Sequence, residues 1–390
     1  MIESIIIYTI VFFIFFSLAR NNVRNATYIS VQNVSFWRGR PFITVYSVAL
    51  ILLFTFFCAV RFNVGKDYLS YLAAYNLSVH DLDFWATHWE RGFYYIVLAC
   101  MELHLPPPYM FGLVALIQIV FFLLAFRREQ YLWPWILLFV CLNGGFLIWM
   151  NGLRQSIALC IWMFSIYFVE EKKILLYFVL CLLAMQFHGS AIILFLFYPL
   201  LMNGKSYFKS IPLQYLLLFS ALIIQQFFMQ VFGGVIDLYI SVSGQSYEHY
   251  LESGYQYGKG NTGIAYWTRF LIHCIIIFYS ERMRLFYNSK RFNIVYTIYF
   301  LGILAAYAIP QDRAILSRAV LYITFWGSIM MGYLVYYLSR SKEKNDNYIM
   351  IGLIFLVVCI FMGSQIVANK YSSVWYQFYF NQPENIFMLY

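Results

Sequence analysis

Apolar runs recur along the whole chain at lengths that suit membrane-crossing helices, and short polar connections separate them. The runs lie at residues 4–19, 42–60, 109–126, 131–149, 152–169, 173–187, 189–202, 211–232, 263–280, 292–309, 314–338 and 348–367. A hydrocarbon layer about 30 Å thick needs roughly 20 apolar residues in a helix, so the pattern predicts about twelve transmembrane helices. The chain lacks the ten-residue segments of strict alternation that are typical of transmembrane β-barrels.

A further apolar piece, residues 93–105, is short for a crossing and is followed by Pro106, Pro107 and Pro108. Because proline interrupts helices, this piece predicts a short re-entrant or interfacial helix. Composition supports the membrane class, since 63% of the 390 residues are hydrophobic and only 11% are charged. We therefore expect an all-α polytopic integral membrane protein with a single transmembrane domain over residues 1–390.

The first run follows Glu3 instead of a basic segment and has no small-residue cleavage site before Arg20, so we expect a retained anchor and not a signal peptide. The seven cysteines lie within apolar runs without metal-type spacing, and no nucleotide-binding fingerprint occurs. We therefore expect no metal and no cofactor. A net charge of +9 would suggest nucleic acid in a soluble chain. Here the charges sort by membrane side, so we expect no nucleic-acid partner.

Lysine and arginine are concentrated in alternate connections, which predicts the orientation of the chain. Seventeen of the 26 basic residues fall on one side, which we assign to the cytoplasm. Both termini are then expected on the outer side of the membrane. The other nine lie on or near the outer side, against the usual bias: Arg61, Lys66, Arg91, Arg154, Lys259, Arg269, Arg313, Arg318 and Lys370. The largest outer loop is expected over residues 233–262, rich in Gly, Ser and Tyr and long enough to cover a site.

The segment from Trp149 to Ala158 places polar side chains inside a long apolar region. At helical spacing Asn151, Arg154, Gln155 and Ala158 fall on one face. An arginine at the centre of a membrane costs roughly 2.5–3.5 kcal/mol on insertion scales, so Arg154 needs a partner or a function. The alternative is an arginine that snorkels from a helix end to the interface.

Other outer-side residues could carry chemistry, each with a structural alternative. Arg61 and Asp67 suit a phosphate beside a sugar hydroxyl, or else they form an ion pair at the interface. Glu90 could orient an acceptor hydroxyl, or else it caps a helix N-terminus. His188 lies in a tight outer turn and could serve as a general base, although a lone histidine is more often structural.

Arg313 and Arg318 stand at the start of a late span. The planar fork of arginine makes bidentate contacts with phosphate oxygens, so this pair could hold two parts of one diphosphate. The structural alternative is an ion pair between Arg313 and Asp312. Several arginines, a histidine and a few acids on one side of the membrane indicate a substrate that is a lipid with phosphate groups.

Five short motifs follow one another along the chain. They are Arg-x-x-Val-Gly-x-Asp-Tyr-x-x-Tyr at 61–71, Glu-x-Gly-Phe at 90–93, Asn-x-x-Arg-Gln-x-x-Ala at 151–158, Phe-His-x-Ser-Ala at 187–191, and Arg318 with Tyr322. This ordered set resembles the EpsG family of Wzy-like polysaccharide polymerases. The resemblance covers about residues 55–325; the first span and the tail after residue 340 carry no motif.

The resemblance implies a GT-C-like glycosyltransferase of the bacterial inner membrane with a periplasmic active site. It implies that an undecaprenyl-diphosphate-linked glycan, of an O-antigen or exopolysaccharide, is joined to the non-reducing end of another lipid-linked repeat unit without a metal. Its partners would be the lipid-linked oligosaccharide as donor and acceptor, the bilayer and a chain-length regulator protein. A directly attacking hydroxyl would invert the anomeric carbon, and a two-step route stays open.

Roles for the individual residues follow from the same resemblance. Arg154, Arg318 and Arg61 are expected to contact the diphosphate, with Arg313 and Arg269 as second choices. His188 is the first candidate for general base, with Asp67 or Glu90 as the alternative, while Asn151, Gln155 and Tyr68 support the site. The rival functions are an O-antigen ligase, a flippase or other transporter of the same lipid, and an acyltransferase.

Overall fold

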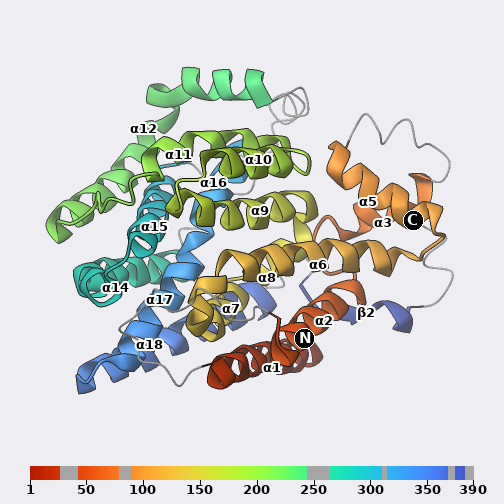
Figure 1. Cartoon of the computed structure of the whole chain (residues 1–390), viewed down its shortest axis with the longest axis horizontal. Helices are drawn as coiled ribbons and strands as arrows, with labels where there is room; N and C mark the ends of the chain where they lie inside the picture. The colour runs from red at the N-terminus through yellow and green to blue at the C-terminus, as the bar shows by residue number, and fades with distance from the viewer. Residues whose placement is uncertain (27–42, 79–88, 244–262, 310–313, 368–373, 383–390) are drawn as a thin grey trace. The chain divides into compact units, whose positions relative to one another are not determined.

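The computed structural model describes residues 1–26, 43–78, 89–243, 263–309, 314–367 and 374–382 (Figure 1). The chain forms two compact units. Unit 1 comprises Met1–Phe168, Leu175–His188 and Val357–Tyr390, and unit 2 comprises Val169–Ile174 and Gly189–Leu356. This division does not test the prediction of one transmembrane domain, because two groups of helices can belong to one membrane-embedded domain.

Helices make up nearly all of the described residues of unit 1. Its elements are α1 (Ile2–Ala26), α2 (Val45–Ala59), β1 (Arg61–Phe62), α3 (Tyr68–Ser78), α5 (Arg91–Glu102), α6 (Pro107–Ala125), the 3-10 helix η2 (Arg127–Leu132), α7 (Trp133–Leu142), α8 (Gly145–Asn151), α9 (Leu153–Glu170), α10 (Ile174–Met185), the π-helix η5 (Phe361–Val367), β2 (Gln377–Phe378) and the 3-10 helix η7 (Tyr379–Asn381). The all-α prediction is confirmed, apart from two strands of two residues each.

Unit 2 is also helical. Its elements are the 3-10 helix η3 (Gly189–Leu196), α11 (Phe197–Leu201), α12 (Ile211–Ser243), α14 (Ile264–Tyr287), α15 (Lys290–Ala308), α16 (Ala314–Thr324), α17 (Trp326–Arg340) and most of α18 (Lys344–Ile360). Helix α12 continues through residues 233–243, where the sequence predicted the start of the large outer loop. The apolar residues Val235, Ile236, Leu238 and Ile240 extend the helical pattern there, and residues 244–262 lie outside the described residues.

Seven of the described helices are long and apolar enough to cross a membrane. An eighth span results if Arg127–Leu142 and Gly145–Asn151, which are bent by 65° relative to each other, form one broken crossing. Three shorter apolar helical segments, Val45–Ala59, Ile174–Met185 and Gly189–Leu201, fall where the sequence predicted further spans. The protein is therefore a polytopic helical membrane protein, whereas the count of twelve spans stays a prediction.

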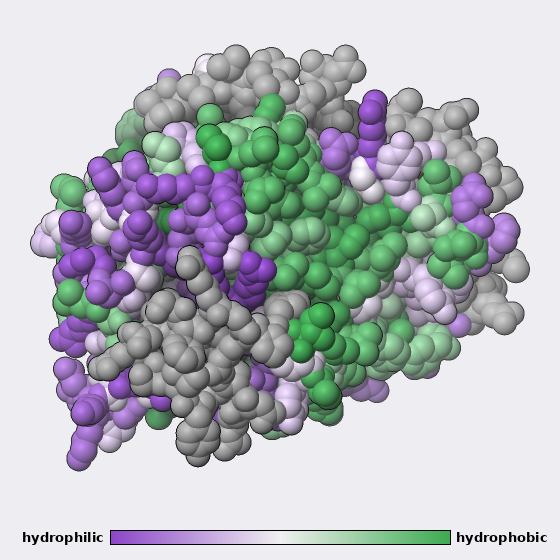
Figure 2. Space-filling view, in the orientation of Figure 1, coloured by the Kyte–Doolittle hydropathy of each residue, from purple (hydrophilic) through white to green (hydrophobic). Residues whose placement is uncertain are grey.

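The surface agrees with this membrane class. On the face drawn in Figure 2, hydrophobic side chains cover a broad area. Helix α10 exposes Leu175, Val179 and Leu182, although its opposite side is buried. An exposed apolar surface of this kind is stable where lipid, and not water, surrounds it. The short helix predicted at 93–105 is present as α5, which ends before the three prolines.

Aromatic side chains fill the centre of unit 1. Helices α1, α2, α6 and α7 pack side by side, and α8 contacts α6 and α7 (Figure 1). The ring of Phe146 on α8 lies 5.6 Å from that of Phe12 and 5.4 Å from that of Phe54. Trp149, one turn further along α8, lies 5.6 Å from Phe54. These edge-to-face contacts fix α8, whose end leads directly into the Arg154 segment.

The C-terminal segment is tied to the start of unit 1, although its sequence carries no motif. Strand β2 pairs antiparallel with β1, so that Arg61 lies opposite Phe378. The hydroxyl of Tyr376 donates to the carbonyl of Phe57 at 2.6 Å, and its backbone N–H donates to Ser4 Oγ at 3.0 Å. Tyr8 donates to the carbonyl of Val374 at 2.7 Å. These bonds hold the end of α2, and with it the Arg61 segment, in one position.

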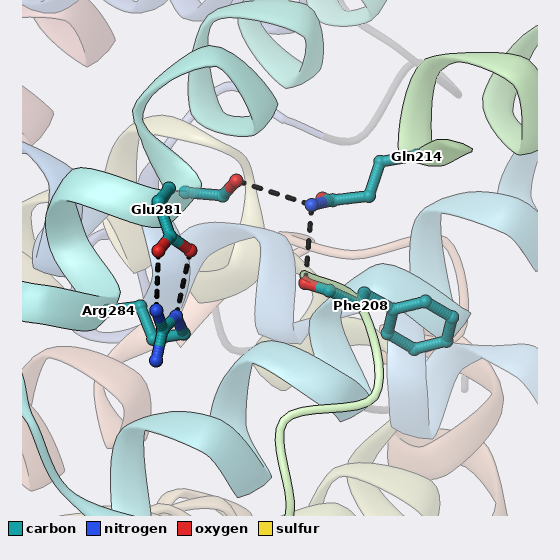
Figure 3. A network of polar contacts seen from close by, with 5 residues as sticks. Phe208, Gln214, Glu281 and Arg284 are labelled. Carbon is teal, nitrogen blue, oxygen red and sulfur yellow. Dashed lines mark hydrogen bonds and ion pairs between the residues drawn. The ribbon is translucent and has the colours of Figure 1, made fainter. Parts of the chain in front are cut away.

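A buried amide organises the interior of unit 2 (Figure 3). Gln214 on α12 donates to the carbonyl of Phe208 and to Ser280 Oγ, both at 3.3 Å, and accepts from the hydroxyl of Tyr296. One side chain thereby links α12 to α14 and α15. Helices α15 and α16 approach so closely that a Cβ on Gly302 would lie 2.3 Å from the carbonyl oxygen of Ile323.

Candidate active site around Arg154

The Arg154 segment is broken between α8 and α9. Gly152 has ψ of 68°, which no α-helix contains, so the helix ends at Asn151 and a new one begins at Leu153. The prediction that Asn151, Arg154 and Gln155 share one helix face is therefore wrong for Asn151. Arg154 and Gln155 instead lie in the first turn of α9, and Asn151 ends α8.

Polar side chains from three other positions donate hydrogen bonds to the backbone carbonyls at this break. Ser156 Oγ donates to the carbonyl of Ile148 at 3.3 Å, Gln118 Nε2 to that of Trp149 at 3.2 Å, and a terminal guanidinium nitrogen of Arg61 to that of Met150 at 2.9 Å. Carbonyl groups at a helix end need partners, all the more where water is scarce. The polar residues inside these apolar runs thus serve first to hold an interrupted backbone.

Arg61 is enclosed and engaged with carbonyl groups. Its side chain is 1% exposed, and besides Met150 it donates to the carbonyls of Cys58 and Val64. The guanidinium also lies 4.6 Å from the ring centroid of Phe111 and 5.5 Å from that of Tyr68. These contacts describe a structural residue that joins the end of α2 to the end of α8. Arg61 and Tyr68 therefore lie beneath the surface of the site and support it. Neither side chain has the exposed surface that contact with a substrate needs.

Asn151 positions the loop that carries Asp67. Its Oδ1 accepts a hydrogen bond from the backbone N–H of Asp67 at 2.9 Å. Gly65 allows the close approach because it adopts φ of +102°, and a Cβ there would lie 3.1 Å from the Met150 carbonyl oxygen. Asp67 itself is half-buried at the start of α3. Asn151 therefore supports the site by holding the loop that carries Asp67.

Arg154 and Glu90 form an ion pair with 2.5 Å between Nη1 and Oε2. Their side chains are 26% and 24% exposed, so the ion pair is partly shielded from its surroundings but can still be reached by a ligand. Glu90 occupies the N-cap position of α5, yet its carboxylate makes no capping hydrogen bond. Its side chain therefore does not act as the predicted alternative, a helix cap. Within the described part of the chain, the Nε of Arg154 is buried and has no hydrogen-bond partner.

Tyr71 completes the group around Arg154. Its hydroxyl interacts with the Arg154 guanidinium and lies within electrostatic range of both Asp67 and Glu90. Burial raises the pKa of Tyr71, and the neighbouring Arg154 charge partly opposes that change. A neutral phenol from α3, a guanidinium from α9, and two carboxylates that directly precede α3 and α5 thus gather at one place.

The His188 turn is anchored to the same place through Gly92. The backbone N–H of Gly92 donates to the Gln186 carbonyl at 2.7 Å, and a Cβ on Gly92 would approach that oxygen to 2.7 Å. Gln186 directly follows α10, and His188, which is 6% exposed, comes two residues later. The start of α5, which bears Glu90, therefore touches the turn that bears His188.

Of the remaining candidates, Arg318 lies in unit 2, Arg313 lies outside the described residues, and Gln155 lies in unit 1. Arg318 is on α16, one turn before Tyr322, whose hydroxyl lies 3.1 Å from Ser190 Oγ. This contact joins the fourth and fifth motifs within unit 2. Arg313 falls outside the described residues. Gln155, beside Arg154 in α9, is 7% exposed.

Sequence reasoning missed three residues of this site. Tyr71 closes the first motif but was not assigned a role, and Gln118 is a single amide in the apolar run of α6. Gly92 stands within the second motif, where its contact with the Gln186 carbonyl needs the absence of a side chain. The sequence does offer a signal for Gln118, because an isolated polar residue in an apolar run indicates a structural or functional role. Among the described residues no cluster of three His, Cys, Asp or Glu side chains could hold a metal ion.

Comparison with known proteins identifies the family. The model of the EpsG family matches residues 44–380, which include every motif described above and the C-terminal strand. No curated protein and no solved structure matches the chain significantly. Because the matched region covers far more than half of the 390 residues, this chain belongs to the EpsG family.

Proposed function

We propose that the protein is a polysaccharide polymerase that transfers an undecaprenyl-diphosphate-linked glycan to the non-reducing end of another lipid-linked repeat unit. Membership of the EpsG family supports a membrane protein of the polysaccharide polymerase type. The observation that carries the proposal is the Arg154–Glu90 pair in unit 1, near which segments of the first four motifs contact one another. The active site would face the periplasm, and the product would be an O-antigen or an exopolysaccharide.

Arg154 is proposed to stabilise the departing diphosphate. Glu90 fixes one end of its guanidinium, and its Nε is left without a partner among the described residues. A positioned cation that meets charge as it develops lowers the barrier more than one that must reorganise. Arg318 stays a predicted second contact on the strength of the family motif. Arg61 is reassigned to support, because its donors serve backbone carbonyls.

The transfer needs a base for the attacking hydroxyl. The acceptor oxygen forms a bond to the anomeric carbon while the bond from that carbon to the diphosphate oxygen breaks. The electron pair leaves with undecaprenyl diphosphate, and the hydroxyl proton passes to the base. His188 remains the first choice, and Asp67 is the alternative. Glu90 is the least suited of the three, because its carboxylate is already paired with Arg154.

The test is a reaction of the purified protein with undecaprenyl-diphosphate-linked repeat units, followed by gel separation. A ladder of products with several lengths is expected. Product only when a lipid A core is added would instead indicate a ligase. If the protein moves the lipid-linked unit across vesicles without joining units, it is a transporter and the proposal is wrong. His188→Ala and Asp67→Asn then identify the base, since the essential one loses the ladder while the protein stays folded.

A further inference from the structure

A second arginine, Arg269, lies in unit 2 among aromatic side chains. It stands in the second turn of α14, half-buried, with Tyr266 one turn before and His273 one turn after it on the same face. The Tyr307 ring on α15 lies 5.3 Å from that of Tyr266, 5.2 Å from that of Phe270 and 5.9 Å from that of His273. Arg269 interacts electrostatically with both Tyr307 and His273.

Arg269 has no anion opposite it in the part of unit 2 that the structure describes. The other two arginines of α14 each have a carboxylate partner, Glu281 for Arg284 (Figure 3) and Glu343 for Arg282. His273 cannot supply a negative charge, and its Nδ1 lies 3.1 Å from the hydroxyl of the fully buried Tyr299. A cation that is half-buried in an apolar protein favours an anionic ligand.

The surroundings indicate what kind of anion. The guanidinium fork and a nearby phenol suit phosphate oxygens, which accept several hydrogen bonds at once. The other side of the same helix exposes Trp267, Leu271 and Phe278, each more than half exposed, as expected where lipid surrounds a helix. Helix α14 therefore borders lipid on one side and carries Arg269 on the other, so a ligand that comes from the bilayer and binds Arg269 would combine a phosphate group with a lipid chain.

We propose that Arg269, with Tyr307 and His273, forms a second binding site for the phosphate group of a polyprenyl diphosphate lipid. The inference rests on the proposed function, in which one lipid-linked unit is the donor and another is the acceptor. Arg154 then binds one diphosphate in unit 1, and Arg269 binds the other in unit 2. A polymerase has to hold both substrates at once, so two separate phosphate sites meet that need.

Native mass spectrometry of the full-length protein with undecaprenyl diphosphate counts the bound lipids without any turnover. Two bound molecules are expected for the wild type, one for Arg269→Ala, one for Arg154→Ala and none for the double variant. Arg284→Ala removes an arginine from the same helix whose charge Glu281 already balances, and it should keep two. Arg269→Lys retains the charge but loses the fork, so its affinity should fall about tenfold.

Two lipids bound to Arg269→Ala, or a wild type that binds only one, would overturn the second site. A parallel titration uses phosphatidylglycerol, since a phospholipid head group presents the same phosphate chemistry. If the Arg269-dependent molecule is phosphatidylglycerol and not the polyprenyl diphosphate, the assignment to the acceptor is wrong. Loss of the polymer ladder with two bound lipids would reject the proposed function and leave the second site standing.

Discussion

At the scale of single residues, side-chain contacts separate roles that the sequence leaves open. Glu90 stands where a helix cap would stand, but its carboxylate faces Arg154. Arg61 is the first residue of the first motif, yet its hydrogen-bond donors serve backbone carbonyls. The sequence shows that a charged side chain in an apolar segment carries a free-energy cost and therefore needs a partner. Which residue is the partner depends on the tertiary fold, because Glu90 lies 64 residues from Arg154 along the chain.

Gly92→Ala tests whether the Glu90 and His188 segments have to touch. The new Cβ would lie 2.7 Å from the Gln186 carbonyl oxygen, so α5 must move away from the turn. We expect a loss of about 1–3 kcal/mol in stability, as for other overpacked sites, together with at least a tenfold loss of polymer formation. Thermal unfolding in detergent and the product ladder measure the two effects.

The matched control is Gly352→Ala in α18, where nothing lies within 4 Å of the new Cβ. Alanine favours helix over glycine by roughly 0.5–1 kcal/mol, so this variant should be as stable as the wild type or slightly more stable. Unchanged activity of Gly92→Ala would mean that the two segments need not be in contact.

At the scale of elements, apolar length predicted the helices well, because a run of apolar residues is a local property of the chain. The breaks were harder to predict. Gly152 separates α8 from α9, and α12 continues into the expected loop. The C-terminal strand was not predicted at all, since two residues carry no periodic pattern and their pairing with β1 joins the two ends of the matched region.

Tyr376→Phe tests the C-terminal segment as a positioning element. The variant removes the hydroxyl that donates to the Phe57 carbonyl and leaves the ring contacts with Tyr8 and Phe57 in place. We expect a loss of about 1 kcal/mol in stability. Because the Arg61 segment is held by this strand, the KM for the lipid-linked unit should rise more than kcat falls.

The matched control is Tyr207→Phe, which loses a tyrosine hydroxyl bond to the Leu200 carbonyl at an exposed position. It should alter neither stability nor KM measurably. Equal changes of kcat and KM in both variants would contradict a specific role for the C-terminal strand.

At the scale of the whole molecule, the number of spans decides where the chain ends lie. Twelve or eight crossings place both termini on one side of the membrane, whereas seven place them on opposite sides. The concentration of positive charges on one set of loops predicts that both termini lie in the periplasm. Fusions of alkaline phosphatase, which is active only outside the cytoplasm, to each terminus should both be active. Activity of only one would favour seven crossings.

The central claim is that Arg154 stabilises the diphosphate leaving group, and polymer formation by Arg154→Ala tests it most directly. We expect at least about a hundredfold loss of the ladder, as when a positioned donor to developing charge is removed, in protein that unfolds at a temperature near that of the wild type. Glu90→Gln should lose less, and the double variant no more than Arg154→Ala alone, because the two residues act as a pair. Arg128→Ala, which removes a guanidinium stacked 4.2 Å from the Tyr167 ring, should keep the ladder. A ladder of normal length and rate from Arg154→Ala would contradict the claim and return Arg154 to a purely structural role.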